Sequence, residues 1–219
     1  MKTAPFLAAL ALLLVGCINI GEKADGPTVV YYVLNDPALK DARPVAQAAA
    51  EPPAPAATSA PAPAPTGSAP TLLVLDTRAG SFYDSDQLVF SRSAGTRGQY
   101  QFARWTERPG KRFAELMRAR LDRQGTWNVS DAGGYVRADR LLDTELVEFY
   151  HDAASNPGQV RLVLRAELLD LKQRKLLGRR VFEQQAPLAS YDAKGAAEAS
   201  NVAVGRVLDD LAAWLATLQ

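Results

Sequence analysis

Cysteine and histidine are almost absent from this sequence, which contains one of each in 219 residues. A single cysteine excludes an intramolecular disulfide and a cysteine-based zinc cluster. A single histidine excludes histidine-rich metal sites and leaves room for at most one Ser/His/Asp-type triad. The sequence also has no large excess of positive or negative charge, because it contains 25 Lys+Arg and 24 Asp+Glu. This balance gives no indication of nucleic-acid binding, while 47% hydrophobic residues suit a globular core.

The apolar run near the N-terminus is too short to span a membrane. Lys2 is followed by ten apolar residues, Phe6 to Val15, which would rise about 15 Å as a helix, half of a hydrocarbon core. A positive start followed by a short apolar region is typical of a secretory signal peptide. The run ends in Leu14-Val15-Gly16-Cys17, which resembles the bacterial lipobox.

The lipobox resemblance implies cleavage before Cys17 and attachment of acyl chains, such as palmitate, to that residue. We therefore expect a lipoprotein signal peptide at 1–16 and a lipidated N-terminal segment at 17–28. Three acyl chains, at about 0.8 kcal/mol per buried methylene, would anchor the protein almost permanently. Ile18 follows the cysteine, and the absence of Asp at this position favours the outer over the inner membrane. The alternative is an inert cysteine at the end of an ordinary signal sequence.

A stretch rich in proline and alanine divides the rest of the chain. Residues 44–70 contain eight Pro and eleven Ala, and proline lacks the N–H donor that helices and sheets need. Such a segment is an extended, semi-rigid spacer; a ligand for a proline-binding module is the alternative. The preceding run at 29–34, VVYYVL, favours a strand. We expect 29–34 to be the first strand of the domain and 35–70 to be a disordered insertion, although a simple tether is the other interpretation.

The remaining residues, 71–219, predict one domain of the α/β (α+β) class, with a single mixed sheet and about two main helices packed on it. A helix is expected from Thr106, its predicted N-cap, to about Arg123, with Gly125 ending it. Residues 140–151 fit neither the helical nor the strand period. The other expected elements are strands at 71–77, 87–92, 99–103, 160–168 and 176–184, and a helix at 193–217.

The order of several short motifs resembles the ABC-type transport auxiliary lipoproteins, which include paraquat-inducible protein C and the lipoprotein components of mammalian-cell-entry (MCE) lipid transport systems. The most specific match is Arg104-Trp105 followed by small and acidic residues up to Pro109. The motifs are structural and not catalytic. The other matching pieces are the lipobox, Tyr32-Val33-Leu34, the segment 87–92, Leu146 to Tyr150, the strand at 160–168, Phe182, and the helix from Ala199 to Leu215.

The resemblance implies a function that the residues alone do not. It implies a non-enzymatic auxiliary subunit on the periplasmic face of the outer membrane of a Gram-negative bacterium, without cofactors. There it would dock a periplasmic MCE protein, and through it an inner-membrane permease and ATPase, and support membrane integrity. It also implies a homo-oligomer and a strand at 140–151. The alternative is a lipoprotein activator or scaffold of a peptidoglycan synthase, for which a 27-residue polyproline spacer would span at most about 84 Å. A periplasmic hydrolase is a third reading.

Two sets of residues are candidates for contacts or chemistry. Arg104 and Trp105 form a possible partner interface, since both types are favoured anchors; alternatively Trp105 packs under the adjoining helix. His151 lies near Asp152 and Ser155, but no G-x-S-x-G elbow accompanies them, so catalysis is disfavoured.

The charged clusters favour structural roles. Asp76, Asp84 and Asp86 fit turns better than a cation site, because their spacing matches no EF-hand loop. Two basic clusters are diluted by acidic neighbours, which predicts solvated faces, with attraction to anionic head groups as the alternative. Their members are Lys111, Arg112, Arg118, Arg120 and Arg123, and Lys172, Arg174, Lys175, Arg179 and Arg180.

Overall fold

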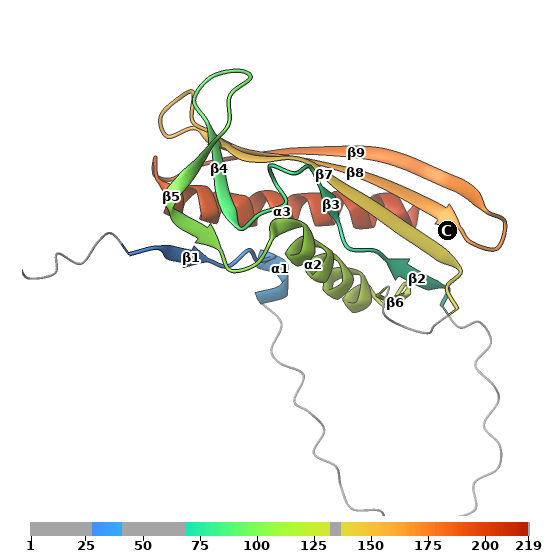
Figure 1. The fold of residues 1–219 in the computed structure, drawn as a ribbon. Helices are drawn as coiled ribbons and strands as arrows, with labels where there is room; N and C mark the ends of the chain where they lie inside the picture. Colours follow the sequence, from blue (N-terminus) through green and yellow to red (C-terminus); the bar gives the residue numbers. More distant parts are fainter. Residues whose placement is uncertain (1–27, 41–68, 132–136, 219) are drawn as a thin grey trace, which may run out of the picture.

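The computed structural model describes residues 28–40, 69–131 and 137–218. These residues form nine strands in one mixed sheet, together with three helices (Figure 1). The expected α+β class is therefore confirmed. The strands are β1 (Val30–Tyr32), β2 (Thr71–Val74), β3 (Arg78–Ala79), β4 (Gln87–Ser91), β5 (Gly98–Trp105), β6 (Asn128–Ser130), β7 (Arg140–Asp152), β8 (Gln159–Asp170) and β9 (Lys175–Pro187), and the helices are α1 (Pro37–Lys40), α2 (Pro109–Gln124) and α3 (Ala193–Ala216).

Strand β7 organises the sheet. One of its edges pairs with β8 in antiparallel fashion along almost its whole length, and β9 continues the sheet beyond β8. Three shorter strands, β2, β3 and β4, pair with successive stretches of its other edge, each parallel to β7. The segment 140–151 is thus a strand, as the family resemblance implied. Beyond β4 lie β5 and then β1, which forms an edge of the sheet.

The two longer helices lie on one side of the sheet (Figure 1). Helix α3 packs along β8 and β9, and its N-cap is Asp192, whose carboxylate accepts a hydrogen bond from Gly195 N at 2.7 Å. Burying one face of the sheet under these helices creates a single core. The fully buried side chains include Leu72, Leu142, Leu146, Leu162, Leu164, Leu168, Phe113, Leu208 and Leu211.

Helix α2 begins later than its sequence suggested. The expected N-cap at Thr106 is wrong: the residue before the helix is Arg108, which makes no capping hydrogen bond. Pro109 takes the first helical position, where its missing N–H costs nothing. The C-terminal end is as expected, because Gly125 adopts φ 67°, the left-handed conformation that glycine tolerates best.

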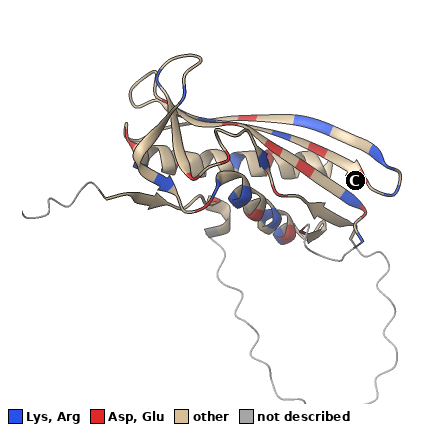
Figure 2. Cartoon of the chain, viewed as in Figure 1, with Lys and Arg blue, Asp and Glu red and all other residues tan. Residues whose placement is uncertain are grey.

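The opposite face of the long strands carries charged side chains. Arg161 pairs with Glu148 of β7 and Glu183 of β9, and Arg165 pairs with Glu145. Figure 2 shows mainly acidic bands on β7, mainly basic bands on β9 and both kinds on β8. Opposite charges on facing positions, such as Glu145 and Arg165, or on diagonal positions, such as Glu148 and Arg161, stabilise a solvated sheet surface.

Candidate functional site

The proposed lipidation residue, Cys17, lies outside the described residues, as do residues 41–68 of the proline-rich stretch. The described part of the chain that follows it most closely is the segment 28–40. Its residues 35–40 were expected to belong to the insertion, and this expectation is corrected by the structure. Residues 37–40 form α1, which contacts α3, and Asp36, 1% exposed, is bonded to Arg120 of α2.

Strand β1 joins this segment to the sheet. It pairs with β5 in parallel, with Tyr31 opposite Arg104 and Tyr32 opposite Trp105. The backbone N–H of Thr106 donates to the carbonyl of Tyr32 at 2.9 Å. The N-terminal segment is therefore built into the domain.

Three arginines of α2 hold the rest of the segment, and we call them the arginine clamp. Arg112 donates to the carbonyl of Leu34 at 3.0 Å, and Arg123 donates to the carbonyl of Ala38 at 2.6 Å. Arg120 makes two hydrogen bonds to the Asp36 carboxylate, at 2.8 and 2.6 Å. At about 100° per residue, positions 112, 120 and 123 fall within about 80° of one helix face.

The ion pair between Arg120 and Asp36 is the buried centre of the clamp. Arg120 is 8% exposed and also contacts Asp209 of α3. Hydrogen bonding to Asp36 raises the pKa of Arg120 above its ordinary value, so the guanidinium stays charged. The interpretation of this basic cluster as a solvated face is wrong for Arg120, because its side chain is buried. Its partner carboxylate, Asp36, lies 84 positions earlier in the chain.

The pair Arg104-Trp105 is split between surface and core. Trp105 is 3% exposed and its ring stacks on Phe149 with centroids 5.7 Å apart. Arg104 is half-buried and pairs with Asp86 at 3.4 Å. Of the possible interface pair, only Arg104 is placed where a partner could touch it in this conformation.

His151 lies in a buried aromatic cluster. Its Nε2 faces the carbonyl of Pro157 at 3.0 Å and must donate to it, so Nδ1 accepts from the Tyr100 hydroxyl at 2.8 Å. Burial lowers the pKa of His151 and raises the pKa of Tyr100 to about 12. Tyr191 packs edge-on against the imidazole.

This arrangement uses both imidazole nitrogens for structural bonds. The carboxylate of Asp152 accepts from Ala154 N and not from His151, and Ser155 is exposed. The structure therefore does not bring His151, Asp152 and Ser155 together as a triad.

The three acidic candidates are each paired with an arginine. Asp76 contacts Arg118 at 2.6 Å, Asp84 contacts Arg108 and Asp86 contacts Arg104. Within the described residues, no cluster of three His, Cys, Asp or Glu side chains could hold a metal ion.

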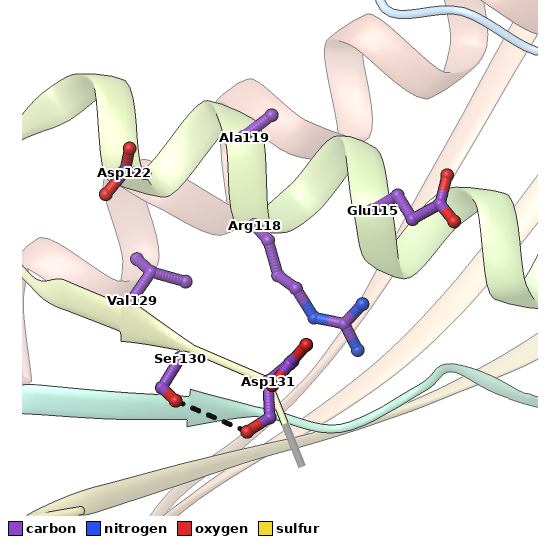
Figure 3. A pocket seen from close by; sticks show the side chains of 7 residues that line it. All are labelled: Glu115, Arg118, Ala119, Asp122, Val129, Ser130 and Asp131. Carbon is purple, nitrogen blue, oxygen red and sulfur yellow. Dashed lines mark hydrogen bonds between the residues drawn. The ribbon is translucent and has the colours of Figure 1, made fainter. Parts of the chain in front are cut away.

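A surface hollow of about 570 Å³ lies between α2 and β6. Figure 3 shows the side chain of Arg118 extending from α2 toward Asp131, and Ser130 bonded to the Asp131 carbonyl at 3.3 Å. The Arg118 guanidinium already donates to the carbonyl of Val74 and to Asp76. Because these N–H groups of Arg118 are already bonded within the domain, the hollow is a poor site for an anion.

No helix in the described ranges is long and apolar enough to cross a membrane. The arrangement as a whole defines an α+β domain whose N-terminal segment is fastened to the body and whose polar clusters serve structure. The chain matches the family described as "ABC-type transport auxiliary lipoprotein component" over residues 52–212. It therefore belongs to this family, as the sequence motifs indicated.

Solved structures share the fold. A Xanthomonas campestris protein of the DUF330 family superposes with a TM-score of 0.61 at 22% identity, covering 66% of this chain and 82% of that one. A second crystal structure, of an uncharacterized protein, gives a TM-score of 0.57 at 14% identity, covering 66% and 92%. The comparison with curated proteins found no match.

Proposed function

We propose that the chain is a lipoprotein anchored through Cys17 in the periplasmic face of the outer membrane, where it serves as the non-enzymatic auxiliary subunit of an MCE-type lipid transport system. Family membership supports the auxiliary role in ABC-type transport. The lipobox at residues 14–17 supports the anchor. The domain would dock the periplasmic MCE protein, which in turn contacts an inner-membrane permease and ATPase, and so support membrane integrity.

The observation that carries this proposal is the fastening of residues 28–40 to the body. Only residues 18–27 lie between the anchor cysteine and the described domain. Ten residues span at most about 33–36 Å, so an anchored domain stays close to the membrane. Lys40 and Ala69, the residues on either side of 41–68, both belong to the described body, so the length of that stretch does not enter this distance.

A short connection suits a subunit that receives a transporter at the membrane. It does not suit the alternative, an activator of a peptidoglycan synthase, which would gain from the 84 Å span that a proline-rich tether could supply at about 3.1 Å per residue. A homo-oligomer is part of the proposal, and light scattering of the detergent-solubilised protein measures its mass.

Affinity purification from cross-linked envelopes tests the proposal. The full-length tagged protein should recover an MCE-domain protein together with its permease and ATPase. The Cys17→Ser variant is the matched control, because it keeps the domain and loses the acyl chains, and the protein should be absent from the outer-membrane fraction. Recovery of a peptidoglycan synthase without any MCE-domain protein would overturn the proposal.

A further inference from the structure

Strand β1 (Val30–Tyr32) and Val33, the residue after it, present apolar side chains to solvent on the face that points away from the helices. Tyr31 is 59% exposed and Val33 is 47% exposed. Side chains alternate along a strand, so Val29 shares this face, while Tyr32 and Leu34 turn toward the core. Val30 lies on the side of Tyr32 and is also 48% exposed. Exposed large apolar residues that occur singly need no explanation, but a contiguous set marks an interaction surface.

The strand register extends this surface onto β5. Tyr31 lies opposite Arg104, and Phe102 is two positions before Arg104 on the same face. Phe102 is 40% exposed. We call Tyr31, Val33 and Phe102 the β1 patch. It differs from the outer face of β7 to β9, where ion pairs cover the sheet.

The position of the β1 patch in the chain indicates that a membrane surface covers it. The patch begins within four residues of the connecting segment 18–27, so it is the part of the body nearest to the anchor along the chain. A tyrosine beside apolar residues suits the boundary between lipid head groups and acyl chains, because its ring is apolar and its hydroxyl can remain hydrated. A second copy of the chain would find only a three-residue edge strand to pair with, and short edges resist such pairing.

We propose that the β1 patch rests in the interfacial layer of the membrane that holds the Cys17 anchor, and so sets the orientation of the domain. This inference rests on the proposed lipidation of Cys17. The acyl chains alone hold only Cys17 at the membrane, whereas a second contact, on the domain itself, also fixes the orientation of the domain relative to the membrane. In Figure 1, β1 lies at one end of the molecule and the turn between β8 and β9 at the other. The long strands would then extend away from the membrane and present that turn to the periplasm.

Fluorescence quenching tests the orientation with the full-length acylated protein. The Tyr31→Trp variant is reconstituted in vesicles of phosphatidylethanolamine and phosphatidylglycerol that contain brominated acyl chains. The native Trp105, Trp127 and Trp214 are at most 8% exposed, so the parent protein supplies a background to subtract. The Leu176→Trp variant is the matched control, because Leu176 is 42% exposed at the distant end of β9.

The expected result is a blue shift and loss of emission for Trp at position 31 in brominated vesicles, with emission at position 176 unchanged. Equal quenching at both positions, or none at position 31, would overturn the proposal. A blue shift at position 31 in detergent without vesicles that grows with protein concentration would assign the patch to a second copy instead and also overturn it. Failure of the lipidation itself is seen separately, as a mass spectrum without the acyl chains and a protein that does not float with the vesicles.

Discussion

Removing the carboxylate of Asp36 is the strongest test of how the N-terminal segment is held. In the Asp36→Ala variant, Arg120 keeps its buried charge and loses its bidentate partner. The Asp36 side chain is 0% exposed and the Arg120 side chain 9%. Removing one member of a buried pair costs about 3–5 kcal/mol. Asp209 compensates little, because its own side chain is 66% exposed.

The cost should be visible in thermal unfolding of the acylated protein in detergent. For a domain of this size, each kcal/mol shifts Tm by about 2–4 °C, which predicts a fall of about 6–20 °C. The Asp76→Ala variant is the control, because its carboxylate is 69% exposed in its pair with Arg118 and such pairs contribute about 1 kcal/mol or less. Adding Arg120→Met to Asp36→Ala should recover much of the loss, since no unpaired charge then remains buried.

A fall in Tm for Asp36→Ala no larger than that of Asp76→Ala would refute the reasoning. It would mean that Arg120 reaches water without cost once its partner is gone. Amide hydrogen exchange separates local from global effects, because release of the segment alone would deprotect β1 and leave β7 and β8 protected.

Three other results are expected. Burial lowers the pKa of His151 below its ordinary value of 6.5, so below pH 6.5 the folded state binds fewer protons than the unfolded state. The unfolding free energy should therefore decline as the pH falls from 6.5 toward the folded pKa. Urea titrations at pH 7.5 and 5.5 measure this decline, which His151→Asn should flatten. Gly158 has φ +79° and an added Cβ would lie 2.2 Å from the carbonyl of Asp152; Gly158→Ala should therefore lower the unfolding free energy by more than about 1–2 kcal/mol, while Gly80→Ala, with open space around it, should change it little. Cys17→Ser should remove the acyl chains from the mass spectrum of the purified protein, and an unchanged lipid mass would contradict the lipobox interpretation.

Two long elements were predictable from the sequence because their periods are clean, whereas β7, with 13 residues, fits neither period and was expected to be a strand only through the family resemblance. The alternation from Val160 to Leu168 predicted β8, and the apolar stripe from Val204 to Leu218 predicted α3. The short strands β3 and β6, with two and three residues, were missed because such strands hold no full period. They exist only because the edges of β7 and β2 are available to pair with.

The arginine clamp could not be predicted from local sequence. Arg112 and Arg120 lie among other charged residues of α2, and their partners come from a segment about 80 positions away. Only the return of residues 34–38 to that helix gives the arginines their acceptors. The fate of Trp105 was open for a similar reason, since its stacking partner, Phe149, lies on β7.

The parallel pairing of β1 with β5 has a mechanical consequence for an anchored protein. A pull transmitted along residues 18–27 would first reach β1, where the hydrogen bonds to β5 share the load. Beyond β1 the force would meet the bonds of Arg112, Arg120 and Arg123 to residues 34–38. The load would end there, ahead of Lys40. The pairing of β1 and the arginine clamp would therefore decide how well the domain withstands movement of the membrane.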